Sequence, residues 1–584
     1  MKFMNAVKEI AIGLYRSLKR FPVTILFSAA VAIMLIVISE LQPTHDTNLR
    51  DTLSRITMIF ALGIPLSLCI KLFFERKDSE RIYKLVIYYA IGAVILLSYY
   101  FFLLEKFDMI STTRYIAVYI TLILGFLFIP YFPKKEQIEM YNIKIFTGFF
   151  ITVIYSIVLY GGLSAILFAI DQLLAIQVLG KVYYYTFLFV ALIFGPSYFL
   201  ADIPIQNEYH TPGNYPKLLR ILFLYIVTPL LSAYTTILYI YFVRIIVTRQ
   251  WPVGLVSHLV LWYSVILSLV LFFITPIKEE NKWANKFLIW APRIILPILV
   301  MMFISMGIRI NAYGVTESRY FVIALGLWVT GIMLYFSFTK KRRNIVLPVA
   351  LAIVAILSVF GPFSSYNVSA LSQNGRFQKI LIRNNMLSDG KIQAAPSSIS
   401  DEDKNEASRI LDYFNTDHSL KEVKYLPENF KIEDMDKVFG FPYSNSQYGA
   451  PEGYYYFTRS QTERAVDISG YDYLFDVRNL YNANGAADST IGAVYQPDAN
   501  IISINYKGNK IYEKDLKLFV KGLVDKYGSN AKGSNLSPEE MTFVEENEKI
   551  KVKFLFMNIS GSKDISTGNT LANGLDFYML VKIK

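Results

Sequence analysis

Apolar stretches of about twenty residues, separated by short charged loops, dominate the first 365 of the 584 residues. An α-helix rises 1.5 Å per residue, so about 20 apolar residues cross the roughly 30 Å hydrocarbon core of a bilayer. Eleven stretches satisfy this length and are predicted to be transmembrane helices. They lie near residues 21–41, 54–74, 83–104, 115–132, 145–173, 183–203, 218–247, 255–276, 287–308, 320–338 and 344–361.

The loops between these stretches differ in basic charge. With the N-terminus inside, the inner segments hold 21 Lys and Arg residues and the outer loops hold 8. Short loops rich in Lys and Arg stay on the cytoplasmic side of a membrane. The sequence therefore predicts a cytoplasmic N-terminus, and the eleventh helix then carries residues 366–584 to the extracytoplasmic side of a bacterial plasma membrane.

Composition excludes some classes of protein. The chain has a formal net charge of +12, a mean hydropathy of +0.38 and one cysteine, Cys69. The basic excess lies between hydrophobic segments, because residues 366–584 carry a net charge of −3. This placement is typical of cytoplasmic loops, and we expect no nucleic-acid partner. A single thiol makes no intrachain disulfide.

The predicted architecture is an all-α polytopic membrane bundle followed by a soluble α+β domain. Residues 1–20 place apolar side chains at helical spacing beside Lys8, Arg16 and Lys19, which predicts an interfacial amphipathic helix on the bilayer surface. Residues 21–365 form the predicted transmembrane domain, and residues 366–584 form the extracytoplasmic domain.

The last domain shows both helical and strand patterns. A helix is predicted at 401–414 with Ser400 as its N-cap, and another at 512–527. Strands are predicted at 453–458, 471–478, 501–506, 550–557 and 576–583, because apolar residues alternate there, as at Ile550, Val552 and Phe554.

The sequence contains no recognised catalytic motif. Its four histidines lack metal-ligand spacing, and neither a GxSxG elbow nor a Walker loop occurs. We therefore expect no catalytic residue, metal or cofactor, although an embedded enzyme stays a third alternative.

Two carboxylates fall inside predicted spans. Asp171 and Asp202 are candidates for an intramembrane ion or proton site, because burying a charge in hydrocarbon is costly unless the charge has a partner. The alternative is that both lie near helix ends.

The densest polar cluster is the loop between the ninth and tenth spans. It holds Arg309, Tyr313, Glu317, Arg319 and Tyr320, which we call the loop cluster. Such residues could bind a phosphate or an anionic lipid headgroup at the outer leaflet. The alternative is a structural clasp that joins two helices.

The loop string RINAYGVTESRYF and the exit string Gly361-Pro362-Phe363-Ser364 also carry a resemblance. They resemble a family of bacterial polytopic membrane proteins catalogued as a domain of unknown function. The resemblance implies membrane class and topology, and it implies no activity.

Two functions remain open from the sequence. The first is transport, or the handling of lipid or an envelope precursor, by the bundle. The second is an envelope sensor or assembly scaffold whose outer domain binds a ligand or a membrane partner protein.

Overall fold

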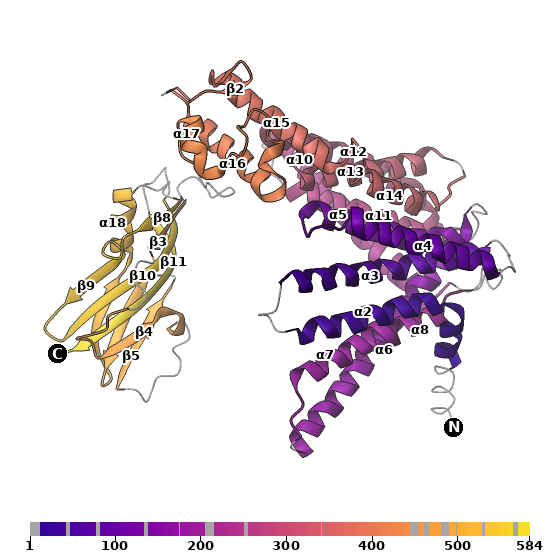
Figure 1. Ribbon diagram of the computed structural model, residues 1–584, viewed down its shortest axis with the longest axis horizontal. Helices are drawn as coiled ribbons and strands as arrows, with labels where there is room; N and C mark the ends of the chain where they lie inside the picture. Colours follow the sequence, from indigo (N-terminus) through magenta and orange to yellow (C-terminus); the bar gives the residue numbers. More distant parts are fainter. Residues whose placement is uncertain are drawn as a thin grey trace. The chain divides into compact units, whose positions relative to one another are not determined.

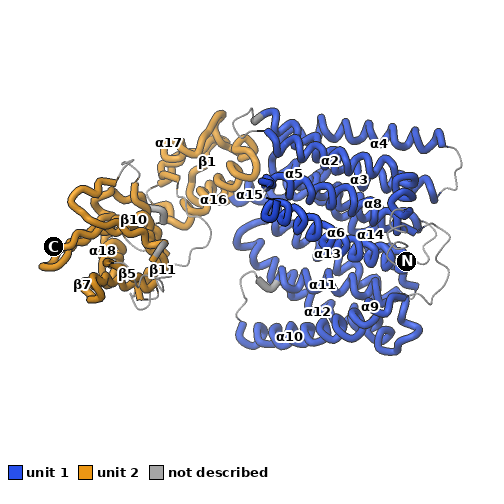
Figure 2. Tube along the Cα trace, turned by 90° about the horizontal axis from the view of Figure 1, so that it is seen from below, with its two compact units in different colours: residues 1–376 blue, residues 377–584 orange. Residues whose placement is uncertain are grey.

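The computed structural model divides the chain into two compact units, Met1–Arg376 and Phe377–Lys584 (Figures 1 and 2). It describes residues 12–41, 47–76, 82–132, 138–174, 176–204, 215–249, 255–339, 341–396, 398–443, 454–460, 466–480, 490–497, 499–527, 532–563 and 570–584. Of the predicted amphipathic segment, residues 12–20 are helical, and residues 1–11 lie outside the described residues.

The first unit is a helical bundle. Within the described residues, ten helices are long and apolar enough to cross a membrane, which confirms the membrane class. Short π-helical or 3-10 segments interrupt or end several of them. The helices are α2 (Pro22–Glu40), α3 (Thr47–Arg76), α4 (Ile82–Phe102), α5 (Met109–Phe128), α6 (Ile138–Leu174), α7–η2–α8 (Gly180–Ala201), α9–η4–α10 (Lys217–Thr248), α11 (Leu255–Ile274), α12 (Lys282–Tyr313) and α13 (Glu317–Phe338).

The segment predicted as the eleventh span forms a shorter helix, α14 (Val346–Leu357), of 12 residues. Its helical part rises about 18 Å, less than a full hydrocarbon core. Hydrogen bonds nevertheless fix both of its ends. Asn344 donates to Glu139 at the start of α6 across 2.7 Å, and Tyr320 at the start of α13 donates to the carbonyl of Phe363 across 2.5 Å.

Side-chain contacts at the ends of the helices lie on two faces of the bundle, which we call face A and face B. Face A holds the ion pairs Arg20–Glu75 and Arg220–Glu280. Face B holds the Lys181–Glu40 pair and the hydrogen bond from Tyr366 to the carbonyl of Ile110. Each of these four contacts joins segment ends that share a face when successive spans run in opposite directions.

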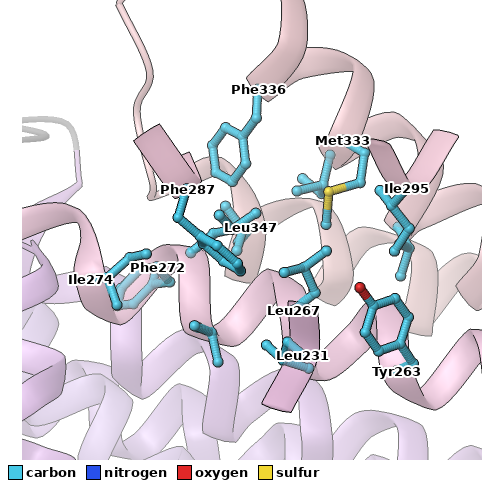
Figure 3. Packing of buried hydrophobic residues seen from close by; sticks show 14 of the residues in the cluster. Leu231, Tyr263, Leu267, Phe272, Ile274, Phe287, Ile295, Met333, Phe336 and Leu347 are labelled. Atoms are coloured by element: carbon cyan, nitrogen blue, oxygen red, sulfur yellow. The ribbon is translucent and has the colours of Figure 1, made fainter. Parts of the chain in front are cut away.

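The largest apolar core of the bundle lies among α10, α11, α12, α13 and α14. Leu267 of α11, Ile295 of α12 and Met333 of α13 are at most 1% exposed and point into this core (Figure 3). Side chains on the outer faces, such as Ile91 of α4, remain exposed, as expected for helices that contact lipid.

Helix α15 (Ser365–Arg383) contains the boundary between the units, which falls eleven residues after the predicted one. The second unit continues with the hairpin β1–β2 and with helices α16 and α17. Ser400 caps α16 by accepting from the amide of Asp403 across 3.2 Å, as the sequence predicts. These elements are β1 (Leu387–Ser388), β2 (Lys391–Ile392), α16 (Asp401–Asp417) and α17 (Met435–Phe439).

The rest of the second unit consists of two sheets and one helix, which confirms the α+β class. The larger sheet has the order β4-β11-β10-β3-β8, with β9 also paired to β10, and the smaller has the order β5-β6-β7. The elements are β3 (Tyr454–Arg459), β4 (Tyr473–Asp476), β5 (Ile491–Gln496), β6 (Ile501–Tyr506), β7 (Asn509–Asp515), α18 (Lys517–Tyr527), β8 (Lys532–Leu536), β9 (Thr542–Glu546), β10 (Ile550–Lys563) and β11 (Thr570–Ile583).

Strand β10 is the centre of the larger sheet. Its side chains Ile550, Val552, Phe554 and Phe556 are fully buried, which follows from the period of two that predicted this strand. The predicted helix at 512–527 is shorter in the structure. Its first residues belong to β7, because they pair with β6.

Candidate functional site

The loop cluster lies on face B, where the chain turns from α12 into α13. Gly314 follows the last residue of α12 and has φ +67°, a backbone conformation that residues with a side chain rarely adopt. Thr316 holds the N-cap position of α13 without a side-chain cap bond, and Glu317 occupies the first turn. Carbonyls at the end of α12 have no partner within that helix, so other groups must satisfy them.

Arg319 supplies donors to these carbonyls. Its Nη1 donates to the carbonyl of Tyr313 across 3.1 Å and to that of Gly314 across 2.8 Å. Its guanidinium carbon also lies 5.6 Å from the centre of the Tyr313 ring. Arg319 and Tyr313 therefore stabilise the turn itself.

Three side chains of helix α15 form hydrogen bonds with the backbone of the same turn. Gln373 donates to the carbonyls of Tyr313 (3.3 Å) and Val315 (2.9 Å), and the amide of Val315 donates to Ser372 Oγ across 2.9 Å. Arg376 donates to the carbonyl of Ala312 across 3.0 Å. We call Ser372, Gln373 and Arg376 the α15 clamp.

The α15 clamp was not predicted from the sequence, although its residues follow a pattern. Ser365, Ser369, Ser372, Gln373 and Arg376 recur at helical spacing, so one face of this segment is polar. Ser365, Ser369 and Gln373 are at most 3% exposed, which shows that the polar face is the buried one.

Two more contacts hold the start of α15 on the bundle. Arg114 of α5 donates to the carbonyl of Val359 across 3.4 Å, and its guanidinium lies 5.6 Å from the Tyr366 ring. Burial raises the pKa of the Tyr366 phenol, and the Glu317 carboxylate also raises it. Glu317 is itself only 7% exposed.

Arg309 differs from the other members of the loop cluster. Its Nε is buried and has no hydrogen-bond partner among the described residues. Buried donors are normally satisfied, so an unpaired one needs an explanation. The structure therefore engages Tyr313, Arg319 and Tyr320 in contacts within the protein, and the buried Nε of Arg309 has no such contact among the described residues.

The two carboxylates lie at helix ends on opposite faces. Asp171, three residues before the end of α6, accepts from the amide of Val178 (2.9 Å) and from Gln172 (2.7 Å). Asp202 follows the last residue of α8 and pairs with Lys144 across 3.1 Å, where Gly148 makes room for it. The structure does not bring Asp171 and Asp202 together, and no group of three metal-ligating side chains occurs in the described part of the chain.

Comparison with known proteins identifies the bundle. Residues 24–397 match the family described as "Domain of unknown function (DUF4153)". The chain belongs to this DUF4153 family. The match confirms the resemblance to a family of membrane proteins catalogued as a domain of unknown function, and it ends before α16.

One relative of this DUF4153 protein is an uncharacterized protein of Pasteurella multocida, PM1469. It is 23% identical over 452 residues, which cover 74% of this chain and 75% of the relative. No solved structure matches the chain.

Proposed function

We propose that this DUF4153 protein is an envelope scaffold or sensor, in which the membrane bundle anchors the helix that leads into the C-terminal α+β unit. The hydrogen bonds of the α15 clamp to the α12–α13 turn carry this proposal. The loop residues first considered as a binding site share that turn with α15, and α15 is the helix by which the chain enters its second unit.

The placement of the carboxylates also supports a scaffold over a transporter. Asp171 binds backbone and side-chain donors beside it, and Asp202 already has Lys144 as a counter-ion. Each lies at a helix end, where a carboxylate reaches water and needs no function to explain it.

The orientation is part of the proposal. The excess of Lys and Arg in the loops of face A places that face in the cytoplasm, so the second unit is extracytoplasmic in a bacterial plasma membrane. There the second unit would bind an envelope ligand or a membrane partner protein.

Lipid or envelope-precursor handling is the second candidate, and Arg309 favours it. Its buried, unpaired Nε on face B could bind the phosphate of an outer-leaflet lipid, with Glu317 and Tyr320 nearby in the sequence. Arg309→Gln should abolish this function and spare a scaffold.

Complementation in the native host separates the two candidates. Cells that lack the chain would receive wild type, a form ending at Arg383, the double variant Gln373→Ala/Arg376→Ala, Asp202→Asn or Arg309→Gln. If the protein is a scaffold or sensor, the truncated form and the clamp variant should not restore the phenotype. Asp202→Asn and Arg309→Gln should restore it. Failure of only the last two, at equal amounts of protein in the membrane fraction, would reject the scaffold and favour transport or lipid handling.

A further inference from the structure

An apolar groove lies between α3 and α4, away from the loop cluster. It has a volume of about 250 Å³, and one of its walls is α4, which lies at the edge of the first unit (Figure 2). Gly92 faces Ile70 across it, and Ile91 and Ile95 on its rim are 51% and 53% exposed. The lining is Leu66, Cys69, Ile70, Phe73, Tyr88, Ile91, Gly92, Ile95 and Ile129.

Both helices that form the groove are candidate membrane spans, so the groove opens into hydrocarbon. The wall is almost wholly apolar and offers no set of polar groups for a soluble ligand. An acyl chain of a lipid fits this groove, because the lining is apolar and the groove opens into the hydrocarbon of the bilayer.

A basic residue stands at the face A end of the groove. Arg76, the last residue of α3, has its guanidinium carbon 5.0 Å from the centre of the Phe73 ring, and its Nη1 lies 3.5 Å from the carbonyl of Ile129. Phe73 and Ile129 both line the groove. The guanidinium therefore lies where the apolar wall ends.

The carboxylate next to Arg76 is already paired with other basic residues. Glu75 pairs with Arg20 across 2.8 Å and with Lys71 across 3.5 Å, and no ion pair joins Arg76 to a carboxylate within the described ranges. An arginine in this position can donate two parallel hydrogen bonds to a phosphate.

We propose that an anionic phospholipid binds at this site, with its phosphate on Arg76 and one acyl chain in the α3–α4 groove. The lipid belongs to the leaflet at face A. The site is independent of the α15 clamp and of the scaffold proposed above, because it lies at the other face of the bundle.

Native mass spectrometry of the full-length, delipidated protein tests the proposal. The protein would be titrated with phosphatidylglycerol and with phosphatidylcholine of the same chains. Wild type should bind the first phosphatidylglycerol about fivefold more tightly, the factor expected for one basic residue near an anionic lipid. Arg76→Gln should remove this preference, and Arg343→Gln, an exposed arginine at face A, should keep it.

Two α4 variants test the position of the chain. Ile95→Trp should cover the groove and weaken binding of both lipids, whereas Ile87→Trp, at a residue 49% exposed and not part of the lining, should leave binding unchanged. Inorganic phosphate should not compete with the lipid, because it lacks the chain.

The proposal is wrong if Arg76→Gln and Arg343→Gln reduce binding equally, since diffuse surface charge would then explain it. Ile95→Trp without effect would also overturn it. Thermal unfolding of each variant checks the fold, and Arg76→Lys, which keeps the charge, should retain most of the preference if Arg76→Gln is unstable.

Discussion

The side-chain amide of Gln373 on α15 donates a hydrogen bond across 2.9 Å to the carbonyl of Val315, in the turn between α12 and α13. Gln373 is 3% exposed and also donates to the carbonyl of Tyr313. One buried side chain thus satisfies two backbone acceptors that lie nearly sixty residues earlier in the chain.

Replacing Gln373 with Ala should lower the free energy of unfolding by about 1–3 kcal/mol, because buried carbonyls would lose their donor. Gln378→Ala, in the same helix but without a described side-chain hydrogen bond, is the matched control. Thermal unfolding of the full chain in detergent measures both. Equal losses would show that the α15 clamp does not stabilise the bundle.

Gly314→Ala should also destabilise the turn. The backbone there has φ +67° and ψ 179°, a region that only glycine adopts readily, at a cost of about 1–3 kcal/mol for other residues. A Cβ atom would in addition lie 2.6 Å from Arg376 Cδ. Gly361→Ala is the control, because Gly361 also has a positive φ, +82°, but an added Cβ there would contact nothing within 4 Å. It therefore shows the cost of backbone strain without the clash. Its effect in the same unfolding assay should be the smaller one.

Ser28 and Pro196 form a pair that a double-mutant cycle can test. Proline lacks an N–H, and Ser28 Oγ donates to the carbonyl of Leu192, four residues before Pro196. Ser28→Ala should destabilise the protein by about 1 kcal/mol, and Pro196→Ala should relieve part of that loss by restoring a backbone donor. Additive effects of the two substitutions would contradict the idea that Ser28 replaces the backbone donor that Pro196 lacks.

Gly561→Ala should disrupt the larger sheet of the second unit. Its Cβ would lie 2.0 Å from the carbonyl oxygen of Leu571 and 2.3 Å from the Tyr455 hydroxyl, and a backbone atom of a paired strand cannot move aside. We expect a loss of about 3 kcal/mol. Hydrogen exchange of β10 and β11 is the measurement, and Gly492→Ala, where no atom lies within 4 Å, should leave their protection unchanged.

The loss of stability on acidification should depend on Asp476. Hydrogen bonds from Arg478, with Nε at 2.9 Å and Nη2 at 2.6 Å, lower the pKa of this carboxyl. A carboxyl with a lowered pKa in the folded state adds stability above its unfolded pKa of about 3.9, and this stability is lost as the pH falls below that value. Asp476→Asn, which keeps an acceptor for the amide of Arg478, should therefore cost stability at pH 6 and little at pH 3. A constant difference in melting temperature across this range would contradict the assignment.

The sequence alone determined the membrane bundle, because length and apolar composition suffice to define a helix that crosses hydrocarbon. In the second unit, the cap at Ser400 and the alternating run from Ile550 were recognisable, since each depends on residues close together in the chain.

Only the tertiary structure decided the roles of the polar residues. Arg319 and Tyr320 were candidates for an anion site, with a structural clasp as the alternative, and backbone carbonyls at Tyr313, Gly314 and Phe363 are the acceptors that the fold brings to them. Every residue has such a carbonyl, so composition cannot indicate which ones will lack a partner. Strand β7 was missed for a similar reason. Its apolar residues also fit a helix, and pairing with β6, a contact between separate segments, selected the strand.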